Sequence, residues 1–277
     1  MRPSFLVLSL LASVATAPLA AAQDDDGDVI VVKSTRRTAT PINEVTRSVS
    51  VITEEQLDIQ SDLDRSAGSV LAQTVPGFSP STEALTNFTQ TLRGRNFQTL
   101  IDGVPQDTPL RNGLRTLNSI DIDAVEQIEV VRGGTAIYGF GADGGLINYI
   151  TKRPEDGEFN ATARAGFSFS TEHPDDSLEF NTNLTASGRS GAHDYLLSGT
   201  FVNRNGTFDA DGNRRPVDPV GAQGGLDESD SFNVLGKLGK QIDPNQRLEA
   251  TLNVFSLRQD ADFGARLSAG TAADFGP

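Results

Sequence analysis

Residues 139–144 (GFGADG) match the glycine spacing G-x-G-x-x-G, which occurs in dinucleotide-binding sites. In such a site a strand precedes the glycines and a helix begins directly after them, so that the helix N-terminus faces the phosphates. Here the next segment, residues 146–151 (LINYIT), is apolar and β-branched, which predicts a strand. We therefore expect a glycine-lined loop that packs tightly against other backbone, and no nucleotide.

Acidic and histidine residues offer no metal site with a recognisable spacing. Residues 24–28 (DDDGD) and 209–213 (DADGN) are acidic, but neither has both the central glycine and the terminal glutamate of a calcium-binding EF-hand loop. His173 and His193 lie on separate turns without further ligands nearby, and the chain has no cysteine. Motifs of serine hydrolases and zinc proteases are missing as well. We predict no catalytic residue, no metal and no cofactor.

The composition excludes further classes of protein. The 277 residues include 23 Lys and Arg against 37 Asp and Glu, a formal net charge of −14. A protein that follows nucleic-acid phosphates needs a basic surface, so a nucleic-acid partner is not expected. The absence of cysteine excludes a disulfide scaffold. The 37% of hydrophobic residues are enough to form a core.

Residues 1–22 (MRPSFLVLSLLASVATAPLAAA) combine a basic residue near the start, a short apolar centre and small residues at the end. This pattern is typical of a secretory signal peptide, and we expect cleavage after Ala22. The apolar stretch is too short for a membrane span. An exported protein without cysteine fits the envelope of a Gram-negative bacterium.

Residues 23–40 predict an exposed tail in which an acidic run precedes the β-prone pentapeptide DVIVV, residues 28–32. Such a segment can add as a strand to the sheet edge of another protein through main-chain hydrogen bonds. It can equally form the first strand of the domain that follows. The residues alone favour neither interpretation.

Residues 41–154 predict one compact α+β domain. Thr53 precedes two acidic residues and therefore resembles a helix N-cap. Asp102 and Gly103 lie between two apolar pairs, which predicts a β-hairpin. The other expected elements are a short helix after Thr53 through Leu57, a helix over residues 66–75, a short helix or turn over 120–125, and strands over 49–52, 89–93, 99–101, 125–131 and 146–151.

Residues 155–277 contain segments in which apolar and polar residues alternate, separated by turns rich in Asp, Gly, Asn and Pro. This period of two predicts β-strands with one apolar face. A soluble sandwich and an outer-membrane barrel share the pattern, and segments of about 10 residues suit the barrel. The absence of tryptophan weakens the case for an aromatic girdle, whereas the signal peptide strengthens the barrel interpretation. The segments cover residues 161–169, 178–186, 195–201, 232–238 and 248–254.

The longest motif, residues 125–154 (VEQIEVVRGGTAIYGFGADGGLINYITKRP), resembles the plug-domain signature of TonB-dependent outer-membrane receptors. Three shorter motifs precede it in the order found in that family: residues 70–77 (VLAQTVPG), 92–94 (LRG) and 100–105 (LIDGVP). Gly134 departs from the pattern, because the family usually has proline there. The resemblance assigns a structural role in the plug to Gly94, Asp102, Gly103, Arg132, Gly133, Gly139, Gly144, Gly145 and Asn148.

The resemblance also implies the fold, an α+β plug domain followed by antiparallel β-strands of a transmembrane β-barrel. Residues 155–277 would be the N-terminal strands of that barrel, and they suffice for about five or six strands. Receptors of this family enclose the plug in about 22 strands. The expected barrel is therefore incomplete, and the chain resembles the front part of a receptor.

The resemblance settles the open interpretation of the tail. It assigns TonB binding to Asp28, Val29, Ile30, Val31 and Val32, which makes residues 23–40 a periplasmic tail with a TonB box. By similarity to hydroxamate-siderophore receptors, Arg93, Gln106 and Tyr138 are expected to contact the ligand. The implied partners are TonB, a ferric siderophore or similar metal chelate, and outer-membrane lipid.

The implied function is energised uptake of a ferric siderophore across the outer membrane, and not an enzymatic activity. The alternative is a stand-alone periplasmic plug-like binding module, or a truncated receptor without function. Residues 155–277 distinguish these, because a membrane-inserted chain must expose their apolar face to lipid.

Overall fold

The structure is a computed structural model. It describes residues 48–80, 86, 90–106, 116–136, 138–139, 141–154, 157–209, 211–214 and 228–259. It also gives the backbone of β1 (Phe5–Ser13), β2 (Val31–Val32), β3 (Thr40–Pro41), β14 (Gly264–Arg266) and β15 (Asp274–Gly276). The predicted cleavage site after Ala22 lies outside the described residues, as do Asp28, Val29 and Ile30.

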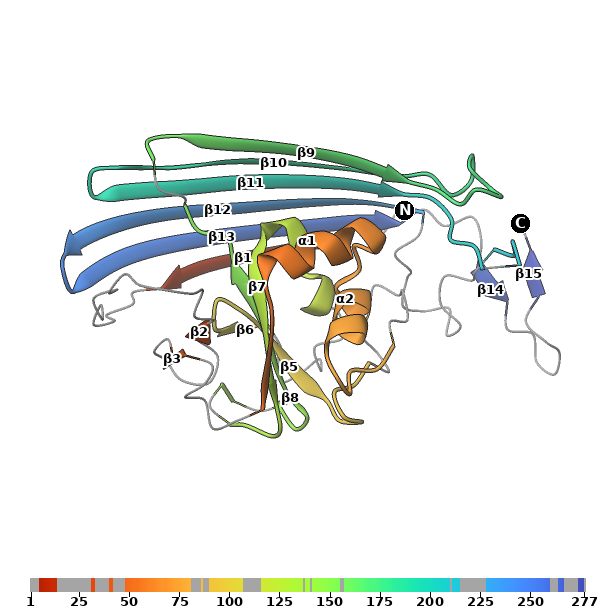
Figure 1. Cartoon of the computed structure of the whole chain (residues 1–277), viewed down its shortest axis with the longest axis horizontal. Coiled ribbons are helices and arrows are strands. Elements are labelled where there is room, and N and C mark those ends of the chain that lie inside the picture. The colour runs from red at the N-terminus through yellow and green to blue at the C-terminus, as the bar shows by residue number, and fades with distance from the viewer. Residues whose placement is uncertain are drawn as a thin grey trace.

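A sheet of long strands lies across a smaller sheet and two helices (Figure 1). We call residues 48–154, which form the smaller sheet and the helices, the plug. Its strand order is β4-β7-β8-β5-β6, with β5 parallel to β8 and the other neighbours antiparallel. The bounds are β4 (Val49–Ile52), β5 (Phe97–Ile101), β6 (Val104–Pro105), β7 (Val125–Arg132) and β8 (Gly145–Thr151). The predicted α+β domain is confirmed.

The first helix of the plug begins where the sequence predicts and runs further. Thr53 forms a capping box, in which its Oγ1 accepts from the Gln56 N–H and Gln56 Oε1 accepts from the Thr53 N–H at 3.2 Å. The helical segments are α1 (Glu54–Leu63), α2 (Ala67–Thr74) and the short 3-10 helices η2 (Thr116–Asn118) and η3 (Ile122–Ala124). No helix in the described parts of the chain is both long and apolar enough to cross a membrane.

The strand expected over residues 89–93 is wrong in its described part. Leu92 forms only isolated bridges, with Phe78 and with Arg95. Arg93 and Gly94 have φ angles of +55° and +71°, in the left-handed region, which interrupts an extended strand. The Arg95 N–H donates to the Leu92 carbonyl at 3.2 Å, so the segment forms a tight turn.

The plug has an apolar core, to which two leucines of the wall also contribute. Every residue of β5 and of β8 is buried. Ile101, Ile147 and Tyr149 belong to one cluster with the helices, and Leu100 and Leu146 belong to a second, smaller cluster. The Tyr149 hydroxyl donates to the Leu117 carbonyl at 3.2 Å, which satisfies its polar group inside the core.

The larger sheet has the order β1-β13-β12-β11-β10-β9, with antiparallel neighbours throughout. We call strands β9 to β13 the wall. They are β9 (Asn160–Ser168), β10 (Glu179–Ser190), β11 (His193–Arg204), β12 (Ser229–Asp243) and β13 (Gln246–Gln259). The predicted strands are confirmed, but β10 to β13 extend beyond the apolar alternation because the ladder continues through polar residues. β1, inside the predicted signal peptide, pairs with β13.

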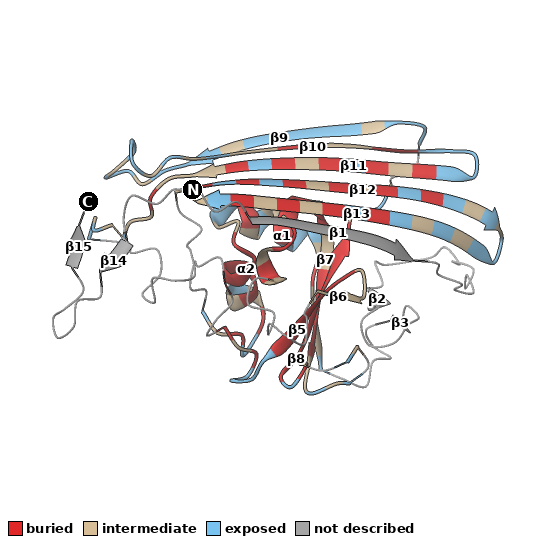
Figure 2. Cartoon of the chain, turned by 180° about the vertical axis from the view of Figure 1, so that it is seen from behind, coloured by how far each residue is buried: buried red, intermediate tan, exposed pale blue. Residues whose placement is uncertain are grey.

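The wall buries a mostly polar face, from which two leucines join the plug core, and exposes an apolar face, as the alternating colours of β11, β12 and β13 show (Figure 2). Asn233 and Asn253 are 2% and 1% exposed, whereas Leu184 and Leu238 are 62% and 67% exposed. A soluble sandwich would turn the apolar face towards its core. The orientation therefore suits a sheet whose outer face lies in lipid.

Candidate functional site

The three residues predicted to contact a ligand lie near one end of the plug sheet, where β5 and β8 begin and β7 ends. Arg93 is exposed in the turn that precedes β5. Gln106 follows β6, and its N–H donates to the Thr99 carbonyl at 2.9 Å. Tyr138 lies between β7 and β8 and packs against the smaller core cluster. The topology thus brings together three segments that are far apart in sequence.

The glycine-rich loop between β7 and β8 packs tightly, as the sequence predicts. A Cβ on Gly144 would lie 2.5 Å from the Leu92 carbonyl oxygen. A Cβ on Gly145, whose φ is +144°, would lie 2.1 Å from the Val131 carbonyl oxygen. β8 begins at Gly145, so no helix N-terminus is available for a phosphate. This geometry confirms a loop packed against other backbone.

The Asp102–Gly103 turn is held by the last residues of β8. Asp102 Oδ1 accepts from the Thr151 N–H at 2.9 Å, and Asp102 Oδ2 accepts from the Thr151 hydroxyl. Asn148 Oδ1 accepts from the Gly103 N–H at 2.9 Å. Asp102 and Gly103 have φ angles of +48° and +80°, which a tight hairpin requires.

Wall residues that the sequence analysis did not single out reach across to the plug. Lys237 on β12 lies 3.2 Å from Asp102 Oδ2, with only 4% of its side chain exposed. On β13, Asn253 Nδ2 donates to the Ser119 carbonyl at 2.8 Å. Both residues lie on the polar face of the alternating strands, which the sequence distinguishes from the apolar face without showing which of them points inward. Their plug partners depend on tertiary structure.

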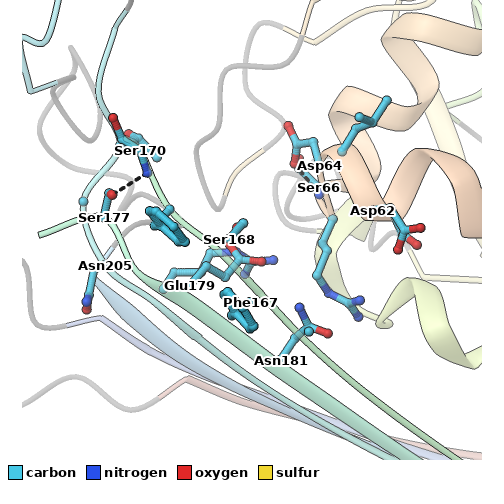
Figure 3. Close-up of a pocket in the computed structure, with 18 of the residues that line it drawn as sticks. Asp62, Asp64, Ser66, Phe167, Ser168, Ser170, Ser177, Glu179, Asn181 and Asn205 are labelled. Atoms are coloured by element: carbon cyan, nitrogen blue, oxygen red, sulfur yellow. Dashed lines mark hydrogen bonds and ion pairs between the residues drawn. The ribbon is translucent and has the colours of Figure 1, made fainter. Parts of the chain in front are cut away.

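A cavity of about 490 Å³ lies between the turn that joins α1 to α2 and the wall strands β9, β10 and β11. Figure 3 shows Asp62, Asp64 and Ser66 on the plug side, opposite Ser168 and Asn181 on the wall side. The cavity has none of the three predicted ligand contacts in its lining. It is therefore a space between plug and wall, separate from the predicted ligand end of the sheet.

Ion pairs neutralise the arginines beside this cavity. Arg65 lies 3.0 Å from Asp121 and 2.7 Å from Asp123, inside the plug. Burial raises the pKa of the Asp121 carboxyl, and the neighbouring Arg65 opposes that shift. On the wall, Arg204 pairs with Glu179 at 3.0 Å. The cavity thus shows no cation that is free to recognise an anion among these residues.

The predicted TonB box lies mostly outside the described residues. Val31 and Val32 form β2, which pairs with β3 in a ladder separate from the plug sheet. These residues are therefore not a strand of the plug sheet. Their assignment to TonB stays a prediction.

The profile of the TonB-dependent Receptor Plug Domain family matches residues 41–146 of the chain. The chain is 32% identical to the ferric aerobactin receptor of Klebsiella pneumoniae over 92% of its own length and 34% of that protein. It is 31% identical to the rhizobactin receptor of Rhizobium meliloti (strain 1021) over 84% of its length and 31% of that protein. The chain thus spans about a third of these curated relatives.

Solved structures share the fold. A ferric enterobactin receptor of Pseudomonas aeruginosa matches 77% of this chain with a TM-score of 0.56 and 20% identity, over 34% of that structure. The alcaligin outer-membrane receptor of Bordetella pertussis matches 85% of this chain with a TM-score of 0.56 and 17% identity, over 36% of that structure. These likenesses cover both the plug and wall strands, so the wall is part of a larger fold in the relatives.

Proposed function

Because this chain belongs to the TonB-dependent receptor family, we propose that it acts in the energised uptake of a ferric siderophore across the bacterial outer membrane. The curated relatives are receptors for the ferric siderophores aerobactin and rhizobactin. The proposal extends their role to this chain. It includes export by the predicted signal peptide and coupling to TonB through residues 28–32.

The orientation of the wall carries the membrane part of the proposal. The exposed face bears a row of phenylalanines, in which Phe167 faces Phe180 and Phe201 faces Phe232 across neighbouring strands. These rings are between 37% and 71% exposed. Aromatic residues near the strand ends are typical of the lipid interface of outer-membrane barrels. Phenylalanine can therefore form the aromatic girdle, although the chain has no tryptophan.

The end of the plug sheet with Arg93, Gln106 and Tyr138 is the proposed ligand-contacting region. The exposed guanidinium of Arg93 can pair with an anionic metal chelate. The Tyr138 ring can stack on the ligand while its hydroxyl forms a hydrogen bond. A siderophore is a suitable ligand, because the curated relatives are siderophore receptors.

Uptake of radioactive iron by cells that express the chain tests the proposed function. Iron-loaded aerobactin and rhizobactin are the probes, in cells that lack their own receptors for both. We expect accumulation that stops when TonB is deleted, and recovery of the chain in the outer-membrane fraction. Recovery in the soluble periplasmic fraction, without iron uptake, would instead support the stand-alone binding module.

Substitution of Ile30 by proline tests the TonB part. Proline removes one backbone donor and restricts φ, so strand pairing with a partner is lost. We expect Ile30→Pro to abolish uptake while siderophore binding to whole cells is retained. Ile30→Val, which keeps the β-branched strand, is the matched control and should transport normally. Normal uptake by Ile30→Pro would contradict the TonB assignment.

A further inference from the structure

Lys237 is a buried cation that crosses from the wall to the plug. It lies on β12, and its Nζ is 3.2 Å from Asp102 Oδ2 and donates to the Thr151 carbonyl at 3.2 Å. Only 4% of its side chain is exposed. Burial of a lysine is unfavourable unless its charge is paired and hydrogen-bonded. Both stabilising partners belong to the plug, so this lysine is satisfied only while the plug lies against β12.

Asp102 is held in place by the plug itself. The Thr151 N–H and hydroxyl both donate to its carboxylate. The Asp102 N–H donates to the Tyr149 carbonyl at 2.8 Å, and the Gly103 N–H donates to Asn148 at 2.9 Å. The carboxylate is therefore prearranged by the plug, and Lys237 is the member of the pair that depends on docking.

A second ion pair crosses this interface, but its side chains are much more exposed to solvent. Arg164 on β9 lies 2.5 Å and 2.9 Å from the two carboxylate oxygens of Asp58 on α1. These side chains are 49% and 41% exposed, and pairs so exposed contribute little to stability. Removal of one partner of a buried pair has a much larger effect, because the other charge stays buried. Lys237 is thus the stronger ionic connection of the two.

The Lys237–Asp102 pair, whose side chains are 4% and 24% exposed, lies at the junction between plug and wall. Thr151 ends β8, and the chain enters the wall at β9, which begins at Asn160. The Asp102–Gly103 turn leads through β6 to Gln106, one of the proposed ligand contacts. Around this junction Lys237, Asp102, Glu54 and Lys152 all act on the Glu126 carboxyl, and Lys152 also pairs with Glu54 at 3.0 Å. Lys237 therefore connects the wall to the turn that joins β5 to β6.

We propose that Lys237 is a positioning residue for uptake, which holds the plug against β12 through Asp102 and must separate from it before the plug moves. The contacts described above support the part of this proposal in which Lys237 holds the plug against β12. The part that concerns uptake depends on the proposed function.

A single cysteine in place of Ala124 reports whether the plug stays packed against the wall. Ala124 is 1% exposed in η3, an element of the plug that contacts β11. The chain has no cysteine of its own, so a maleimide labels only the reporter. In outer membranes from cells expressing the chain, Lys237→Met should raise the labelling rate about tenfold or more. Lys240→Met, on an exposed position of the same strand, should leave the rate unchanged.

A double-mutant cycle shows whether the effect passes through Asp102. Asp102→Asn keeps an acceptor for Thr151 but removes the charge that faces Lys237. If the pair seats the plug, the double variant should label no faster than the faster single variant. Additive effects, or an unchanged rate in Lys237→Met, would overturn the proposal. If Lys237→Met fails to assemble, Lys237→Arg is the second variant. It keeps the charge and should be labelled as slowly as the parent chain.

The labelling assay uses neither siderophore nor TonB, which separates the two proposals. Faster labelling of Lys237→Met without iron uptake by the parent chain would sustain the seating role and refute the proposed function. Iron uptake by the parent chain with no change in the labelling of Lys237→Met would support the proposed function and refute the role of Lys237 in holding the plug.

Discussion

Single glycines determine how closely the plug strands approach one another. Gly145 begins β8 at a φ of +144°, and an added Cβ would lie 2.1 Å from the Val131 carbonyl oxygen. Because the obstructing atom belongs to the backbone of β7, a larger residue cannot be accommodated by a side-chain rotation. The glycine pattern that resembled a nucleotide site therefore reflects backbone packing.

Gly145→Ala should destabilise the chain by about 2 kcal/mol or more, since the strand pairing must shift to admit the methyl group. Urea unfolding of the chain in detergent measures the change. The matched control is Gly199→Ala on β11, where an added Cβ meets no atom within 4 Å. Equal stability of the two variants would contradict the packing argument.

The pKa of the Glu126 carboxyl makes the stability of the chain depend on pH. One of its carboxylate oxygens is buried without a hydrogen bond among the described residues, and lies 3.7 Å from Arg153. Burial raises the pKa of this carboxyl. The nearby groups also act on it: Lys237 and Lys152 lower its pKa, whereas Glu54 and Asp102 raise it.

A raised pKa means that the folded chain holds the Glu126 proton more tightly than the unfolded chain does. Its contribution to stability is therefore largest at low pH, and declines as the pH rises from the ordinary glutamate pKa through the raised one. Glu126→Gln should remove this decline and stabilise the chain at neutral pH. Urea unfolding at about pH 4 to 8 tests this, and an unchanged pH dependence would refute it.

At the scale of elements, each strand of the wall has one apolar face and one polar face. The alternation along β9 to β13 predicts two-faced strands but is the same for a sandwich and for a barrel. Contact with the plug decides the orientation, because the inward face meets polar groups such as the Ser119 carbonyl and Asp102. The outward face is left with the large apolar side chains.

Leu197→Arg distinguishes a lipid-facing wall from a solvated one. Leu197 lies on the outer face of β11 and is 57% exposed. In lipid, an arginine near the bilayer centre destabilises a barrel by about 2–4 kcal/mol, whereas in water an exposed arginine is nearly neutral. We expect a marked loss of heat-modifiable, membrane-assembled protein.

The matched control is Leu63→Arg, which replaces another exposed leucine, 73% exposed at the end of α1 in the plug. It should assemble like the parent chain. Normal assembly of Leu197→Arg would argue that the outer face of the wall is in water.

At the scale of the whole molecule, two domains with opposite patterning depend on each other. The plug has an apolar core and the wall has an apolar exterior, and their common boundary combines hydrogen bonds with the buried wall leucines Leu196 and Leu235. The chain spans about a third of its curated relatives, so the plug and wall described here match only part of those proteins.

Local sequence was sufficient for the plug elements and for the family. The capping box at Thr53, the Asp102–Gly103 hairpin and the strand at residues 146–151 depend on neighbouring residues, whose conformational preferences act over a few positions. Contacts between distant segments could not be predicted in this way. Tertiary structure alone decided that residues 92–95 turn, which wall face is buried, and that Lys237 reaches Asp102, because burial and ion pairing depend on which surfaces the fold brings together.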